Sequence, residues 1–303
     1  DQQISDELRK MIALPCKLGG MVIINPMENA NEEYINSSEL TNKLTNSIIN
    51  QEHSYTVTEN EIKNIRSSIR KKRILKQKVA LKSLREEMSY METRLNDISH
   101  EQGASSWLTV LPIKRLGFGL SKAEFWDAVR LRYGLPLKRL PSHCGCSSQF
   151  SVQHAISCKK GGFVTLRHNE LRDNIAEMLD EITHDVSVEP VLQPLTGEAL
   201  QGNCSDEARS DICARRFFIR GQRAYFVIRI FDPNAQRHQN RTLRKCYETN
   251  ENEKKREYNT RILNVEQGSF TPLVFSITGG MGRECSMFIK KLCQLIAYKR
   301  KEE

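Results

Sequence analysis

The sequence predicts an α+β protein of more than one domain, with a helical N-terminal half and a C-terminal α/β domain built on a mixed sheet. Three observations lead to this prediction. The 303 residues exceed the length of one small module. Apolar residues recur at helical spacing through the first half. After residue 163, short β-prone runs alternate with helical segments, which is the pattern of a sheet covered by helices.

The N-terminal half is expected to be helical over most of its length. After a helical opening, paired glycines in residues 14–20 turn the chain into the apolar run 21–24, which we expect to be a short buried segment. A polar stretch over 51–60 reads as a loop. Gly103 is expected to end a long amphipathic helix. The helices expected in this half span residues 38–49, 62–98 and 121–133.

The C-terminal part is expected to form one compact α/β domain. Leu171, Ile175 and Leu179 mark the buried face of its first helix. The turn at 278–282, rich in glycine, is expected to lead tightly from the last strand into the last helix. The strands are expected at 186–192, 209–214, 224–231 and 270–277, and the helices at 169–182, 241–266 and 283–298.

Composition excludes two classes of protein. Hydrophobic residues make up 39% of the chain, but no run approaches the roughly 18 uncharged apolar residues of a transmembrane helix. No charged-then-apolar signal segment stands at the front. We therefore expect neither membrane residence nor secretion. Because the chain opens on Asp1 within a helical pattern, we expect it to be a piece of a longer protein.

The positive charge is concentrated in one segment. Residues 61–85 hold ten Lys or Arg residues and one acid. The net charge of this segment, +9, equals the net charge of the whole chain. A concentrated cationic stripe is the usual electrostatic footprint for phosphate backbones. A solvated helix face or a nuclear-import signal would also carry such charge. The candidate nucleic-acid-binding residues of this basic helix are Lys71, Lys72, Arg73 and Lys76.

Four potential metal ligands lie within fifteen residues. Cys144, Cys146, His154 and Cys158 follow the spacing C-x-C-x7-H-x3-C. Zinc takes four sulfur or nitrogen ligands in a tetrahedron, and two close pairs can supply them. The sequence therefore predicts a structural Zn²⁺ site of the knuckle kind, which can also contact nucleic acid. His143 could replace one of the ligands.

The other cysteines show no ligand spacing. Nine cysteines is an odd number, and a disulfide framework belongs to short secreted domains. We therefore expect a reducing compartment, the nucleus or the cytoplasm. The remaining cysteines are expected to pack as small hydrophobic side chains, and they are Cys16, Cys204, Cys213, Cys246, Cys285 and Cys293.

Beyond the cysteine cluster the sequence resembles the C-terminal region of animal retroelement polyproteins. In that family a reverse transcriptase is followed by a zinc knuckle and a restriction-like endonuclease. The resemblance covers most of the chain, but no aromatic-x-Asp-Asp strand of a polymerase core is present. The segments that carry the resemblance are residues 14–20, 25–26, 103–109, 159–163, 167–173, 270–276 and 278–282.

The resemblance implies a division into four segments. Residues 1–102 correspond to a helical region after the polymerase, with the basic helix at 61–85. Residues 103–142 form a helical connector and 143–162 the zinc knuckle. Residues 163–303 correspond to the restriction-like domain, with DNA and element RNA as partners. We expect neither a membrane nor a small-molecule substrate as a binding partner.

Restriction-like nucleases hold Mg²⁺ between an acid at a bend and an acid on the next strand, with a basic residue two positions further on. In this sequence Asp211 occupies the first position and Arg229 the basic position. Val227 stands where the second acid is expected. Because a single carboxylate holds Mg²⁺ weakly, we expect the nuclease to be impaired in this chain.

Further residues complete the candidate site. Glu170, Glu177 or Glu189 could supply another carboxylate, and we include Glu170 and Glu189 among the candidate catalytic residues. The resemblance implies that Arg167 and His168 contact the DNA backbone or support the site. Two other interpretations remain open from sequence: a non-catalytic nucleic-acid-binding module, and a retroelement fossil without selected function.

Overall fold

The computed structural model describes residues 4–51, 59–195 and 208–302. It confirms an α+β protein, about 58% helical, with a four-stranded mixed sheet. The chain forms two compact units. One unit contains Asp1–His100 and Ser105–Leu135, and the other contains Glu101–Ala104 and Pro136–Glu303. The connector helix thus belongs to the first unit, and the Cys/His segment belongs to the unit that holds the sheet.

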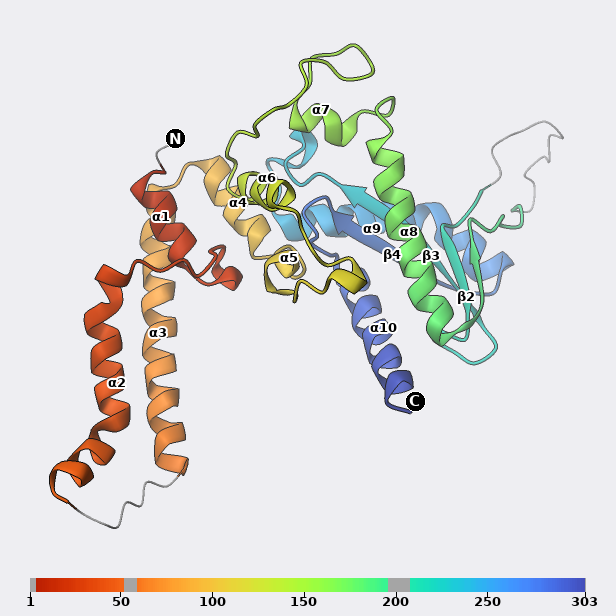
Figure 1. Ribbon diagram of the computed structural model, residues 1–303. Coiled ribbons are helices and arrows are strands. Elements are labelled where there is room, and N and C mark those ends of the chain that lie inside the picture. The colour runs from red at the N-terminus through yellow and green to blue at the C-terminus, as the bar shows by residue number, and fades with distance from the viewer. Residues whose placement is uncertain (1–3, 52–58, 196–207, 303) are drawn as a thin grey trace. The chain divides into compact units, whose positions relative to one another are not determined.

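All regular elements in the described residues of the first unit are helices. Its two longest helices, α2 and α3, lie side by side (Figure 1). Asn25 caps the start of α2 by accepting a hydrogen bond from the Met27 N–H, and Pro26 occupies the first helical position. The helices are α1 Asp6–Ala13, α2 Pro26–Ile49, α3 Glu59–Glu87, α4 Tyr90–Ser99, α5 Ser106–Thr109 and α6 Lys122–Arg132, with 3-10 turns η1 Cys16–Leu18 and η2 Lys114–Leu116.

Two sequence expectations in this unit are wrong. The long helix predicted over 62–98 breaks after Glu87, because Ser89 and Glu92 form a capping box that starts α4. The apolar run 21–24 is exposed rather than buried, with Ile23 61% exposed. Of the loop expected at 51–60, residues 52–58 lie outside the described residues, and Glu59 already belongs to α3.

The second unit is built on a sheet with strand order β1-β2-β3-β4. β1 and β3 both pair antiparallel with β2, whereas β4 is parallel to β3 and is reached through α9. Its elements are α7 Val152–Ser157, α8 Phe163–Ile182, β1 His184–Val188, β2 Ile212–Arg215, β3 Arg223–Phe231, η3 Gln236–His238, α9 Leu243–Thr260, η4 Arg261–Val265, β4 Ser269–Ser276 and α10 Arg283–Glu302.

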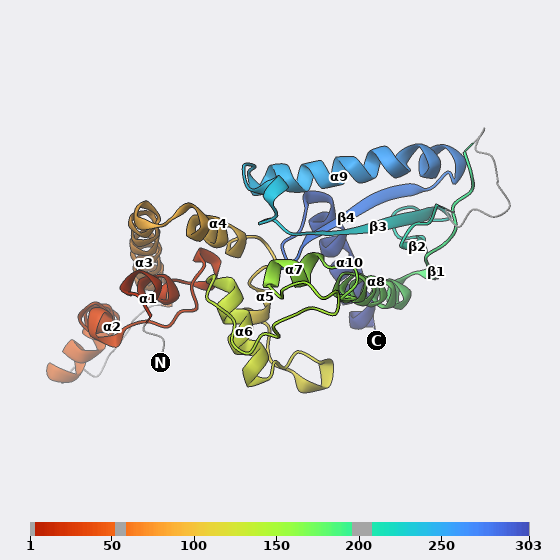
Figure 2. The ribbon, with the colours of Figure 1, turned by 90° about the horizontal axis from the view of Figure 1, so that it is seen from above.

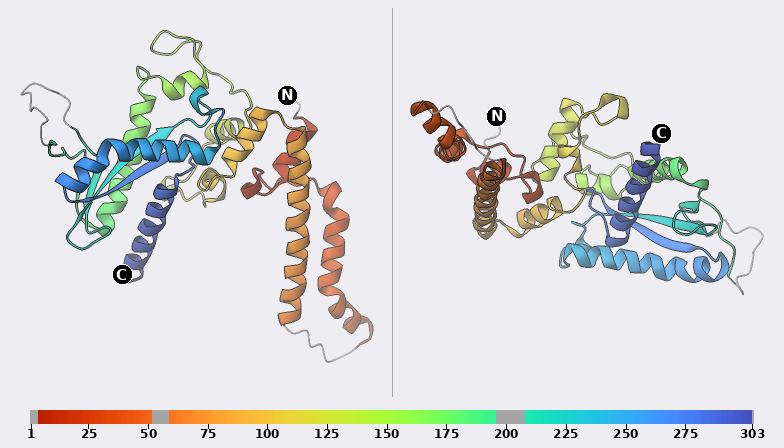
Figure 3. Two further views of the ribbon diagram at one scale, coloured as in Figure 1. Left: turned by 180° about the vertical axis from the view of Figure 1, so that it is seen from behind. Right: turned by 90° about the horizontal axis from the view of Figure 1, so that it is seen from below.

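Helices cover both faces of this sheet. α8 and α10 lie on one face and α9 on the other, as Figures 2 and 3 show from above, behind and below. On the first face Leu179, Phe226 and Phe288 are almost fully buried in one apolar cluster. On the second face Tyr225 and Ile262 belong to a smaller cluster. Alternate residues of β3 therefore face opposite layers, which makes Val227 and Arg229 neighbours of α9.

The glycine-rich segment after β4 is a tight turn, as expected. Gly279 has a φ of 88°, which favours glycine. A Cβ at Gly280 would lie 2.3 Å from Oε2 of Glu101. The turn is therefore packed against the short segment Glu101–Ala104, whose Glu101 accepts a hydrogen bond from the Tyr247 hydroxyl at 3.0 Å.

The described cysteines form no disulfide. Cys213, Cys246 and Cys285 are buried as expected, whereas Cys293 is exposed and Cys204 lies outside the described residues. No helix in the described ranges combines the length and the apolar character needed to cross a bilayer.

Candidate functional site

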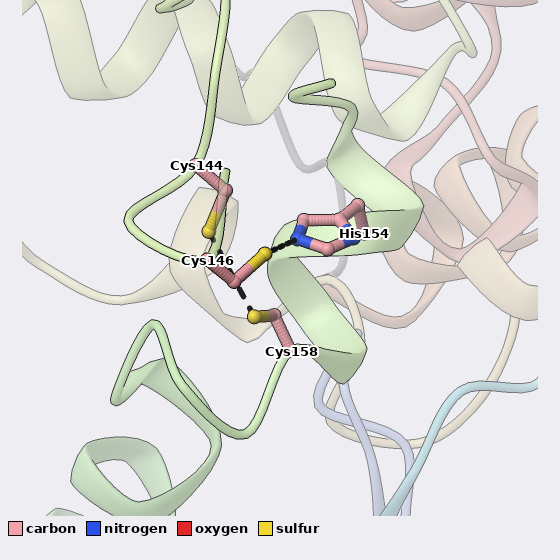
Figure 4. Close-up of side chains that lie close together, drawn as sticks. All are labelled: Cys144, Cys146, His154 and Cys158. Carbon is pink, nitrogen blue, oxygen red and sulfur yellow. Dashed lines mark hydrogen bonds between the residues drawn. The ribbon is translucent and has the colours of Figure 1, made fainter. Parts of the chain in front are cut away.

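Cys144, Cys146, His154 and Cys158 lie together in the structure (Figure 4). Their ligand atoms all lie within 4.8 Å of one another. The Cys144 and Cys158 sulfurs are 3.8 Å apart, and the Cys146 sulfur is 3.1 Å from Nε2 of His154. Such separations fit four ligands around one tetrahedral ion. The structure thus confirms a Cys₃His cluster with the donors to bind a metal such as zinc.

Local backbone structure brings the four ligands together. The chain from Cys144 to Ser148 turns back on itself, because the Cys144 N–H donates to the Ser148 carbonyl at 2.9 Å. Ser151 then caps α7 by accepting from the His154 N–H, and Cys158 stands at the end of the same helix. His143, considered as an alternative ligand, is exposed and lies outside the cluster.

One cysteine of the cluster is prepared for metal binding. Hydrogen bonds from the Ser148 side chain and backbone lower the pKa of Cys146 to about 6. The lowered pKa favours the thiolate of Cys146, which is the form that binds metals.

A second group of polar side chains surrounds Asp211, just before β2. Oδ2 of Asp211 accepts a hydrogen bond from the Ile228 N–H at 2.5 Å, and Oδ1 lies 3.2 Å from Nε2 of His168. The Asp211 N–H donates to the Phe226 carbonyl at 3.1 Å. Asp211 therefore contacts the β3 backbone on both sides of Val227, through its carboxylate at Ile228 and through its backbone N–H at Phe226.

The register of the sheet aligns the acidic positions in one row. Val188 pairs with Ile212, and the Glu189 N–H donates to the Asp211 carbonyl at 2.9 Å. Ile212 pairs in turn with Phe226. One position beyond these pairs, Glu189 follows the end of β1 and Asp211 precedes the start of β2, so both continue the row toward Val227 of β3. The backbone of position 227 therefore lies beside Asp211, while the Val227 side chain faces α9.

The third position of this row carries no charge. Val227 is only 3% exposed and packs in the layer beneath α9. Two residues further along the same face, Nε of Arg229 donates to Oδ1 of Asn250 at 3.4 Å. The basic residue predicted from sequence thus has the expected spacing, but the carboxylate expected before it is absent at Val227.

The two acids added as candidates have different surroundings. Glu189 belongs to the row and forms an ion pair with Arg172. Glu170 is exposed on α8, about 200° around the helix from His168, so the structure does not bring it to Asp211. Glu177 is also exposed on the outer side of α8.

Sequence analysis missed Arg172, which pairs with both Glu189 and Asp173. It stands four residues after His168, so both side chains lie on the face of α8 that points toward Asp211 and Glu189. That helical spacing was the signal available in the sequence.

Arg167 and His168 do not act together. Nη2 of Arg167 donates to the Ile156 carbonyl at the end of α7 at 3.4 Å, and burial lowers the pKa of the Arg167 guanidinium, partly opposed by Asp232. Arg167 therefore holds the metal-cluster segment against α8, whereas His168 contacts Asp211.

The basic helix α3 has two different faces. Toward α2, Nη2 of Arg73 donates to both carboxylate oxygens of Glu33, at 2.7 and 2.9 Å. Lys76 pairs with Glu32, and Lys72 lies 4.0 Å from Glu39. These three candidate nucleic-acid residues are thus partly neutralised by acids that sequence analysis did not connect with them.

The other face of α3 remains cationic. Lys71, Lys78 and Lys82 are exposed and form no ion pair with any residue in the described ranges. Their spacing of seven and four residues puts them in one stripe, together with the exposed side chains of Leu75 and Val79.

No protein-family model matches the chain, and no curated protein is a significant match. The structure alone therefore describes the chain, as an α+β protein with a Cys₃His cluster that has the ligands for a metal such as zinc.

Proposed function

We propose that the chain is the C-terminal part of a retroelement polyprotein whose sheet domain descends from a Mg²⁺-dependent, restriction-like endonuclease. In this proposal a zinc knuckle and the basic helix bind DNA or element RNA, and target-DNA nicking is impaired. The parent polyprotein would be an RNA-directed DNA polymerase. The row formed by Glu189, Asp211 and position 227 carries the proposal, because it would align carboxylates beside one phosphate if Val227 were an acid.

The residues present fit this interpretation in part. Asp211, with Glu189 beside it, would hold Mg²⁺, but Glu189 is already paired with Arg172. When bound, Mg²⁺ would lower the pKa of a water molecule and stabilise charge on the scissile phosphate. Arg229 would hold the attacking water or the phosphate. Without a carboxylate at 227, the weak hold on the metal accounts for the proposed impairment.

Plasmid nicking tests the proposed nuclease ancestry. The chain with zinc bound is compared with Val227→Asp and Val227→Asn, with and without Mg²⁺. We expect Mg²⁺-dependent nicking from Val227→Asp alone, because Asn matches its size without the charge. Absence of nicking by a folded Val227→Asp variant would count against the ancestry. Nicking by the unaltered chain would contradict the impairment.

The buried Val227 side chain favours a second candidate function, a non-catalytic nucleic-acid-binding module. The charge distribution on α3 supports nucleic acid as the ligand of such a module. Under this alternative the Cys₃His cluster and the cationic stripe act alone, and the sheet domain serves as a scaffold.

Substitutions in the cationic stripe of α3 test whether this helix binds nucleic acid. We expect replacement of Lys71, Lys78 and Lys82 by Ala to weaken duplex binding and to lower the salt dependence, the slope of log K against log salt, by about 2.7. The matched control replaces Lys72, Arg73 and Lys76, which pair with α2 glutamates. Fluorescence anisotropy measures the duplex affinity of both triple variants. An equal loss of affinity in the two variants would contradict DNA contact through the cationic stripe.

A further inference from the structure

His168 and Asp211 offer two possible metal ligands at one point of the proposed nuclease site. Nε2 of His168 and Oδ1 of Asp211 are 3.2 Å apart. Two ligands about 2.1 Å from one ion, at an angle of about 90–100°, are about 3.0–3.2 Å apart. The pair therefore has the separation of neighbouring ligands in an octahedral site as well as that of a hydrogen bond.

The neighbouring cations are engaged elsewhere. Arg172 pairs with Glu189 and Asp173, and Arg229 donates to Asn250. Among the described side chains, the ion-pair partner of Asp211 is therefore His168. The His168 and Asp211 side chains remain 31% and 20% exposed, so an ion from solvent can reach both of them.

The donors of this pair do not suit Mg²⁺ well. Mg²⁺ prefers oxygen ligands, whereas imidazole nitrogen suits first-row transition ions. We propose that His168 and Asp211 together bind a divalent transition-metal ion in preference to Mg²⁺. This inference rests on the proposed function, because it assigns the metal of the same acidic row. His168 thereby becomes a metal ligand and not the DNA contact expected from sequence.

Mn²⁺ binding to the full chain tests the assignment. The Cys₃His cluster is first filled with Zn²⁺, and Mn²⁺ is titrated while free Mn²⁺ is measured by electron paramagnetic resonance. We expect one bound Mn²⁺ per chain, with nitrogen modulation of its electron spin echo. His168→Ala should weaken binding at least tenfold. His168→Gln, which keeps a polar partner for Asp211, should remove the nitrogen signal.

The matched control is Glu177→Gln, which is exposed on the opposite side of α8 from His168, and it should leave the Mn²⁺ affinity unchanged. Absence of Mn²⁺ binding, bound Mn²⁺ without nitrogen modulation, or competition by Mg²⁺ at equal concentration would each overturn the proposal. Nicking by Val227→Asp is measured separately. A silent nicking assay together with nitrogen-ligated Mn²⁺ would therefore reject the nuclease ancestry and retain the metal site.

Discussion

Replacing Cys158 with serine is expected to abolish stoichiometric zinc binding, whereas the unaltered chain should carry one Zn²⁺. The physical reason is that a structural zinc site needs four ligands, and Cys158 is one of the four that the structure brings together. Structural zinc contributes about 10–16 kcal/mol in zinc-finger peptides at neutral pH. Loss of one of four ligands should therefore release the metal and unfold α7, while the apolar core between the sheet, α8 and α10 remains.

Zinc content by mass spectrometry and the visible spectrum of the Co²⁺-substituted chain measure this effect. Cys293→Ser is the matched control, because Cys293 is exposed and lies outside the cluster. A zinc-free unaltered chain, or a Cys158→Ser variant that retains full zinc, would show that the cluster is not a zinc site.

Val227→Asp is expected to make the stability of the sheet unit depend on Mg²⁺. Position 227 is only 3% exposed, and an uncompensated buried charge costs about 3–5 kcal/mol. Asp211 beside it adds like-charge repulsion. A divalent ion bound between the two carboxylates removes this cost, and Mg²⁺ at 100 times its Kd should restore about 2.7 kcal/mol.

Thermal unfolding with and without Mg²⁺ measures the restoration. About 2.7 kcal/mol corresponds to a rise in Tm of roughly 5–10 °C for a unit of this size. Val227→Asn controls for size without charge and should gain no stability from Mg²⁺. Equal Mg²⁺ effects on the unaltered chain and on Val227→Asp would contradict a metal position at 227.

Features with a local cause could be predicted from the sequence. The Cys₃His cluster depends on ligand spacing within fifteen residues, and the structure brings all four ligands together. The alternation of strands and helices likewise predicted a mixed sheet. The break between α3 and α4 was missed although its signal, the Ser89–Glu92 capping box, is also local.

Features that depend on distant contacts could not be predicted in this way. Arg73 pairs with Glu33, forty residues earlier, so the division of α3 into a neutralised face and a cationic face required the α2–α3 packing. The selection of Glu189 over Glu170 depends on the strand register and on the direction of each side chain. His168 meets Asp211 only because α8 packs beside the sheet.

The most direct measurement compares plasmid nicking by Val227→Asp with nicking by the double variant Asp211→Asn/Val227→Asp, both with zinc bound and in Mg²⁺. We expect the single variant to nick DNA and the double variant to lose this activity, because both carboxylates must hold the ion. Equal nicking by the two variants would contradict a metal site in the row of Asp211 and position 227.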